Sequence, residues 1–180
     1  MNNLLKNKEY DLAKLLSNTC TSRYIDDICI INYKNFDNLL SKIYPLSLEA
    51  SRSGMDNKNA EYLDINIQIT NASAVTSVFH KVDNFNFPVT LLTFPENTMP
   101  YRTGIRVFAG QVLRYARICS LKEDFINKVD NTSSILIARG YNKYELKRSA
   151  ERQLHKHTQT IKKYGCFSAK QLMDKCHSFL

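Results

Sequence analysis

The sequence feature that most constrains the fold is a change of hydrophobic period partway along the chain. From Leu63 to Ile69, apolar residues alternate with polar ones, which is the period of a strand with one buried face. From Gly104 onward, apolar residues recur every three or four positions instead, as they do in amphipathic helices. Strands followed by a run of helices predict an α+β fold whose second part is all helical.

The first part of the chain is predicted to contain two β-hairpins and two short helices. Each expected strand is a short run rich in β-branched residues, and polar residues lie at the turn of each hairpin. Each expected helix has apolar residues at helical spacing. In chain order, the elements are a helix over residues 3–16, a hairpin over 24–31, a helix over 35–43 and a hairpin with strands over 63–69 and 75–79.

The second part is predicted to be a compact bundle of three or four helices with short joints. Ser120, Asn142 and Ser168 each precede a Glu or Gln by three residues, a capping pattern that starts helices. Gly140 and Gly165 are placed to end the second and third helices. The predicted apolar positions of the first two helices are Val107, Phe108, Val112, Tyr115, Cys119, Phe125, Val129, Thr132 and Leu136.

The net charge of +8 comes from the second part of the chain. Residues 1–100 contain 9 Lys and Arg against 11 Asp and Glu, whereas residues 101–180 contain 16 against 6. Such an excess indicates a polyanionic partner, of which nucleic acid is the commonest, and a solvated basic face is the alternative. Five scattered cysteines favour reduced thiols inside a cell. The sequence contains no run of about 18 apolar residues, so no membrane-spanning helix is predicted.

Three arginines share one side of the first helix predicted in the second part. Arg106, Gly110, Arg114 and Arg117 are spaced four, four and three residues apart. Guanidinium groups bind phosphate well, and a glycine among them allows a phosphate backbone to approach closely. A solvated face is the alternative, but such faces normally mix both signs, and no acidic residue lies between these arginines.

Two adjacent aspartates, Asp26 and Asp27, lie at the turn of the first predicted hairpin. Neighbouring carboxylates repel each other unless a cation neutralises them. A hairpin turn projects both into one cleft, where hard oxygen ligands suit a divalent metal and in particular a two-metal phosphoryl-transfer site. An ordinary turn is the alternative, because Asp is common in turns.

The segment Tyr24-Ile25-Asp26-Asp27, with an apolar strand on each side, resembles the catalytic palm hairpin of reverse transcriptases. The surrounding sequence resembles retroelements of the Penelope-like type in particular. The segments that carry this resemblance follow in the family's order over nearly the whole chain, at residues 12–28, 43–49, 62–67, 83–88 and 110–120.

The resemblance implies a fold, a reaction and partners. The fold is a partial reverse-transcriptase palm over residues 1–85, a connection over 86–103 and a thumb-like helical bundle with helix-turn-helix character over 104–180. The reaction is nucleotidyl transfer to a DNA primer on an RNA template by a two-metal mechanism with Mg²⁺ or Mn²⁺. The partners are therefore RNA template, DNA primer and the RNA–DNA hybrid, and no membrane is expected.

The resemblance also assigns roles to single residues. Asp26 would bind the metal with help from Asp27, and Tyr24 would line the nucleotide and primer side of the catalytic cleft. The second hairpin resembles the primer grip, so Lys81 at its exit would touch a phosphate. The other candidate nucleic-acid-binding residues are those of the predicted helix face, which follow from spacing and charge: Arg106, Gly110, Arg114 and Arg117.

Reverse transcriptases also need an aspartate from an upstream palm strand and fingers that bind the nucleotide. About twenty residues precede the hairpin here, which is too few for either. We therefore expect the C-terminal portion of an RNA-directed DNA polymerase, inactive unless the missing N-terminal polymerase part is supplied. The alternatives are a stand-alone basic nucleic-acid-binding module with a relic hairpin, and a retroelement remnant without a biochemical role.

Overall fold

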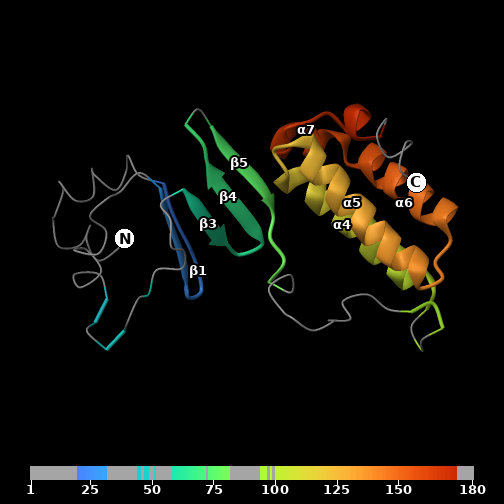
Figure 1. The fold of residues 1–180 in the computed structure, drawn as a ribbon, viewed down its shortest axis with the longest axis horizontal. Helices are drawn as coiled ribbons and strands as arrows, with labels where there is room; N and C mark the ends of the chain where they lie inside the picture. The colour runs from blue at the N-terminus through green and yellow to red at the C-terminus, as the bar shows by residue number, and fades with distance from the viewer. Residues whose placement is uncertain are drawn as a thin grey trace. The chain divides into compact units, whose positions relative to one another are not determined.

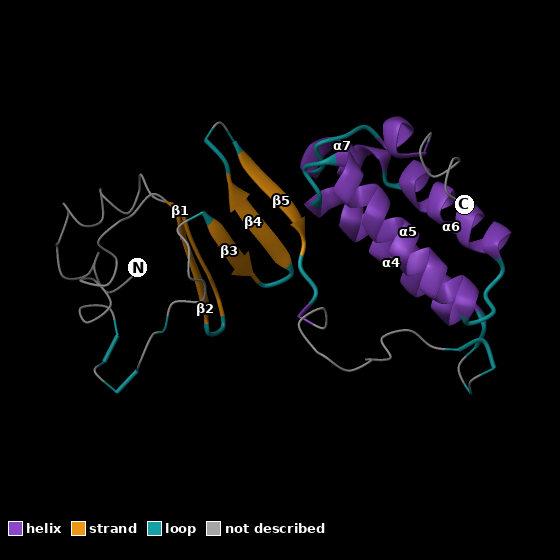
Figure 2. Cartoon of the chain, in the orientation of Figure 1, coloured by secondary structure: helices purple, strands orange, loops and turns teal. Residues whose placement is uncertain are grey.

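The structure is a computed structural model, and it describes residues 20–31, 44–45, 47–48, 51, 58–71, 73–81, 94–96, 98 and 100–173. The chain divides into two compact units, Met1–Met55 and Asp56–Leu180, and the described elements are antiparallel strands followed by helices (Figures 1 and 2). The predicted α+β class is confirmed. The helices predicted over 3–16 and 35–43 lie outside the described residues. Within the described part, no helix combines the length and the apolar character needed to span a membrane.

The first unit contains the predicted hairpin. Strand β1 (Cys20–Tyr24) pairs antiparallel with β2 (Asp27–Ile31), and Tyr24 faces Asp27 across the ladder. Ile25 and Asp26 therefore form a two-residue turn. The three middle residues of β2 are half-buried, whereas the residues at the turn are exposed, so the strands carry the packing and the turn is left to the solvent.

The second unit begins with a three-stranded antiparallel sheet, which consists of β3 (Asn59–Tyr62), β4 (Ile65–Ile69) and β5 (Ala74–Val78) in that order. The hairpin of β4 and β5 confirms the prediction, but β3 was not predicted as a strand. Leu63 was placed in a strand and instead lies in the β3–β4 turn with φ 56°. Leu63 and Ile69 are exposed, so the buried face of β4 is shorter than the alternation predicted.

The helices of the second unit pack around the first of them. Helix α4 (Arg102–Ile118) contacts α5 (Lys122–Ala138), α6 (Lys143–Lys156), α7 (Thr158–Tyr164) and strand β5. The third predicted helix is divided at His157 into α6 and α7. The Thr158 hydroxyl donates to the carbonyl of His155 at 2.7 Å, and this local hydrogen bond competes with the regular helical pattern.

The predicted helix caps were partly correct. The Asn142 side chain accepts hydrogen bonds from two backbone N–H groups of α6, Ser168 and Gln171 form a reciprocal capping box, and Gly140 follows α5 with φ 96°. The Ser120 cap was wrong. The α5 helix begins at Lys122 without a side-chain cap, because the Ser120 hydroxyl accepts a hydrogen bond from the Thr76 N–H of β5 instead.

The hydrophobic core of the second unit lies between the helices and also includes Val78 of β5. Most predicted apolar positions are buried in it, but Val107 is 42% exposed and was wrongly assigned. Gly104 of α4 is tightly enclosed: a Cβ there would collide with the ring of Tyr141, which stacks on Tyr101. The largest fully buried side chains are Tyr115, Phe108, Phe125, Leu136, Leu146, Leu154, Ile161 and Leu172.

Strand β5 is attached to the joint between α4 and α5. The backbone of Thr76 exchanges hydrogen bonds of 2.8 Å with the N–H and the hydroxyl of Ser120, and the Thr76 hydroxyl donates to the Ile118 carbonyl at 2.6 Å. The sheet therefore belongs to the same compact unit as the helices. The division predicted from the sequence is different, because it places this sheet with the first hairpin in residues 1–85.

Candidate functional site

The hairpin turn of the first unit presents Tyr24, Asp26 and Asp27 to the solvent. Tyr24 and Ile25 are 57% and 69% exposed, and both aspartates are exposed. Ile25 has φ 50°, a left-handed conformation that is rare for a β-branched residue and costs about 1–2 kcal/mol. Two-residue hairpin turns favour a positive φ, and Leu63 adopts the same conformation in the β3–β4 turn, so the geometry of the turn accounts for this strain.

Arg23 braces this turn, although no pattern in the sequence assigned it a role. Its Nε donates to the Ile25 carbonyl at 3.0 Å, and its Nη1 donates to the Tyr44 hydroxyl at 2.9 Å. The guanidinium also lies over the Tyr44 ring, 5.2 Å from its centre. The only signal in the sequence was that a basic residue directly precedes the motif.

The donor set at the turn fits a hard divalent cation. Asp26 and Asp27 contribute carboxylate oxygens, which Mg²⁺ and Mn²⁺ prefer, and neither forms an ion pair with another described residue. Mg²⁺ is usually held by one or two carboxylates, with water and substrate phosphates as the other ligands. Among the described residues, no group of three or more His, Cys, Asp or Glu gathers into a fuller metal site.

The second unit displays an arginine row on the outward side of α4. Arg106, Gly110 and Arg117 are exposed, and nothing lies within 4 Å of where a Gly110 Cβ would be. Arg102 is also exposed and lies four residues before Arg106, so it extends the row by one helical turn. The prediction missed it because the helix was expected to begin at Gly104, although the same four-residue spacing would have found it.

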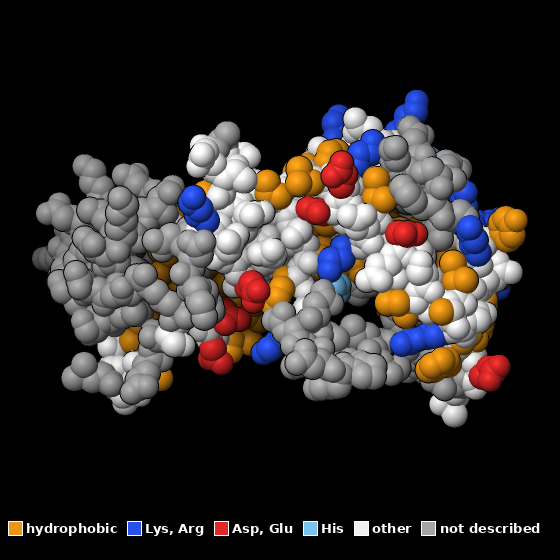
Figure 3. Space-filling view, in the orientation of Figure 1, with side chains coloured by type: hydrophobic (Ala, Val, Ile, Leu, Met, Phe, Trp, Pro, Cys, Tyr) orange, Lys and Arg blue, Asp and Glu red, His pale blue; other side chains and the backbone are white. Residues whose placement is uncertain are grey.

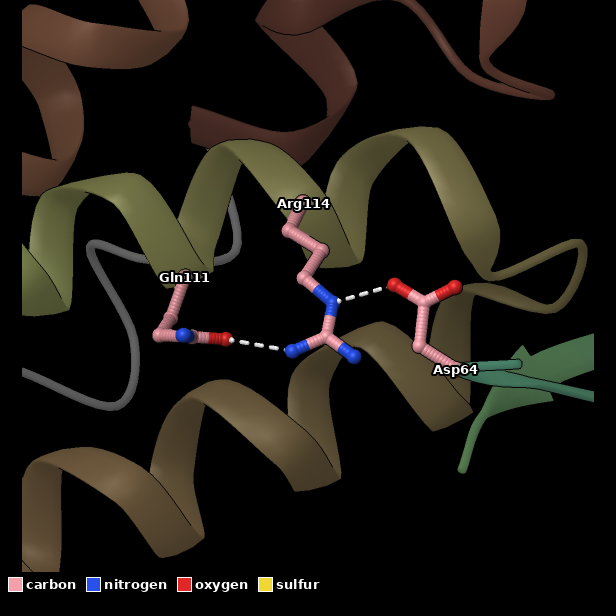
Figure 4. Close-up of polar contacts among 3 residues, drawn as sticks. All are labelled: Asp64, Gln111 and Arg114. Atoms are coloured by element: carbon pink, nitrogen blue, oxygen red, sulfur yellow. Dashed lines mark hydrogen bonds and ion pairs between the residues drawn. The ribbon is translucent and has the colours of Figure 1, made fainter. Parts of the chain in front are cut away.

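Arg114, the remaining member of the row, is engaged by the sheet (Figure 4). Its Nε donates to Asp64 Oδ2 at 2.8 Å, and its Nη1 donates to Gln111 Oε1 at 3.3 Å. The Arg114 side chain is only 24% exposed. The sequence predicted a guanidinium open to phosphate, but the structure gives Arg114 a carboxylate partner in the β3–β4 turn.

Lys81 is exposed three residues after the end of β5, and it forms no ion pair with a described residue. The residue before it is held in place: the ring of His80 packs edge-on against Tyr115, with 6.2 Å between the ring centres. The backbone at Lys81 is thus held near α4, while its ammonium group is open to the solvent.

Thiol chemistry is not available at Cys119. Burial raises the pKa of the Cys119 thiol to about 11, so the thiol stays protonated near neutral pH. Only the thiolate is a good nucleophile or metal ligand. Cys119 is therefore a residue of the core.

Comparisons of this chain with protein-family models, with curated proteins and with solved structures find no match. The features that indicate a function are two exposed carboxylates at the hairpin turn of the first unit and, in the second unit, an arginine row whose members other than Arg114 are exposed.

Proposed function

We propose that this chain carries the end of the palm and the thumb-like domain of a retroelement reverse transcriptase of the Penelope-like type. The observation that carries the proposal is the hairpin. Tyr24-Ile25-Asp26-Asp27 forms a two-residue turn between antiparallel strands, with both carboxylates exposed. The ordered segments that resemble this family over nearly the whole chain support the same assignment.

In this proposal, Asp26 and Asp27 hold the metal ions, and Tyr24 lines the nucleotide and primer side of the cleft. The chemistry supplied by bound Mg²⁺ is activation of the primer 3′-hydroxyl and stabilisation of the leaving pyrophosphate. Arg23 donates to the Ile25 carbonyl and so steadies the backbone directly before Asp26. The active site of this family also uses an aspartate from an upstream palm strand and fingers that bind the nucleotide.

The proposed partner of the second unit is an RNA–DNA hybrid. Arg102, Arg106 and Arg117 are exposed along one side of α4 and can neutralise phosphates at several points of a nucleic-acid backbone without reading bases. A polymerase has to hold any sequence, and an A-form hybrid is recognised through its backbone and shape. Lys81 would contact a further phosphate, and the open surface at Gly110 would let the phosphate backbone approach α4 closely.

The metal site can be tested by Mn²⁺ titration of the full chain, followed through the NMR signals of backbone amides. Paramagnetic broadening should begin at Tyr24–Ile28, because the two carboxylates are the ligands. Asp26→Asn should remove this broadening, whereas Asp130→Asn, which replaces an exposed aspartate of α5, should not. Broadening that is absent or equal at both aspartates would contradict the metal site.

A second candidate function is a stand-alone nucleic-acid-binding module with a relic hairpin. It is favoured by the position of the arginine row, which lies in a compact unit of its own, Asp56–Leu180. This candidate predicts no Mn²⁺ at the hairpin, but it predicts binding of the hybrid that weakens in the Arg106→Gln and Arg117→Gln variants and falls steeply with salt. No binding of the hybrid at low salt would contradict both functions.

A further inference from the structure

Helix α6 has a second outward row of residues that the proposed function does not use. The helix buries Leu146, Ala150 and Leu154. On its opposite side, the exposed residues are spaced four, four and three apart, so they form one row. This row consists of Tyr144, Arg148, Arg152 and His155.

Tyr144 begins the row with an unusually accessible ring. It is 80% exposed, the highest value among the exposed large hydrophobic side chains of the described residues. Its backbone is nevertheless fixed, because the Tyr144 N–H donates to Asn142 Oδ1 at 2.9 Å and the Asn142 N–H donates to the Tyr101 hydroxyl at 3.2 Å. Packing does not account for this ring, which is held at the first turn of α6 with its faces open.

The surroundings of the row are strongly basic. Residues 139–173 contain 9 Lys and Arg but only 2 acids, Glu145 and Glu151, and Figure 3 shows Lys and Arg side chains gathered around α6 and α7. The side chains of Arg148 and Arg152 form no ion pair with a described residue. Their charge is therefore available to an anionic partner.

We propose that this row binds a single-stranded nucleic acid, with a base stacked on Tyr144 and phosphates on Arg148 and Arg152. An aromatic ring followed by cations suits a strand whose bases are unpaired, because the faces of paired bases are covered by their neighbours. Four residues of helix rise about 6 Å, and the long arginine side chains can follow the successive phosphates of an extended strand. The proposal does not depend on the polymerase, since it uses a different helix and a different ligand.

The first test measures binding of a fluorescent single-stranded RNA of about 15 nucleotides, near the upper site sizes of single-strand binders, to the full chain. Tyr144→Ala should weaken binding at least about fivefold, whereas Tyr144→Phe, which keeps the ring, should bind like the unaltered chain. Arg148→Gln and Arg152→Gln should each reduce the salt slope by about 0.7. The matched control Lys58→Gln removes one exposed charge next to β3 and should reduce the slope less.

A second test detects stacking directly. The chain has no tryptophan, so Tyr144→Trp introduces a single indole whose emission should fall when a base stacks on it. Ile135→Trp, at an exposed position of α5, is the matched control and should not respond. Equal responses at the two positions would overturn the proposal.

Further outcomes separate this inference from the α4 site. Arg106→Gln with Arg117→Gln should weaken binding of the RNA–DNA hybrid while single-stranded RNA still binds, so either site can fail alone. Equal binding by Tyr144→Ala and Tyr144→Phe would overturn the proposal. The proposal would also be overturned if the double variant Arg148→Gln, Arg152→Gln bound single-stranded RNA normally and lost binding only to vesicles of phosphatidylcholine and phosphatidylserine.

Discussion

Replacing Asp64 tests whether Arg114 holds the sheet onto α4. The two side chains meet at 2.8 Å and are 44% and 24% exposed. An exposed ion pair contributes about 0–1 kcal/mol, whereas a hydrogen bond to a charged group contributes about 1.5–3 kcal/mol. Because this pair is half-buried and Gln111 also holds the guanidinium, we expect an intermediate interaction of about 1 kcal/mol.

The measurement is a double-mutant cycle on the full chain, with Asp64→Ala, Arg114→Ala and the double variant unfolded by urea. The cycle is needed because Arg114→Ala also removes the packed aliphatic part of the side chain. The interaction free energy should be about 1 kcal/mol, and salt should reduce it only in part because the pair is partly shielded. A value below about 0.3 kcal/mol, the usual error of additivity, would refute the reasoning.

The same pair distinguishes an anchoring arginine from the arginines that are proposed to bind phosphate. Arg114→Gln should lower the free energy of unfolding and leave the salt dependence of hybrid binding nearly unchanged. Arg106→Gln should leave the free energy of unfolding nearly unchanged and lower the salt slope of hybrid binding by about one. An equal loss of slope in both variants would mean that Arg114 leaves Asp64 to reach a phosphate.

Three further predictions concern stability and reactivity. Gly104→Ala should lower the free energy of unfolding by about 1–3 kcal/mol, because the added methyl group would collide with the packed Tyr141 ring. Gly110→Ala is the control, and because it lies in open space it should raise the free energy of unfolding by about 1 kcal/mol. Both values can be measured by urea unfolding. Ile25→Gly should relieve the left-handed strain and increase amide-exchange protection in the first hairpin, corresponding to about 1 kcal/mol. Cys119, whose pKa is raised to about 11, should resist iodoacetamide at about pH 8 while exposed Cys166 is alkylated, as mass spectrometry can show. Alkylation of both thiols at the same rate would contradict that burial.

The features that could be predicted from sequence are those set by residues close together in the chain. The Asn142 cap acts on N–H groups two and three residues away, and Gly140 ends α5 because it tolerates a positive φ. The two-residue turn at Ile25 is bounded by runs with clear strand propensity. In each case, the residues that determine the feature lie only a few positions apart in the chain.

The failures have the opposite cause. The Ser120 hydroxyl is held by Thr76, which lies 44 residues earlier in the chain, so a local capping pattern was overruled by a tertiary contact. Strand β3, with three exposed residues, has no apolar pattern of its own and exists because it pairs with β4. The Tyr44 hydroxyl, which also holds the Arg23 guanidinium, lies 21 residues away. The spacing of residues along the chain gives no information about such distant partners.

The arginine row of α4 shows why this difference matters for function. Helical spacing correctly places Arg106, Arg114 and Arg117 on one side, but it does not say which of them is already paired. Asp64 brings a negative charge to the row, and that charge would repel a phosphate unless it were neutralised. In the proposed function, Arg114 would anchor the sheet and, by neutralising Asp64, keep the row compatible with a polyanion. The charge of Arg114 would then act on binding through Asp64 and not through a phosphate of its own.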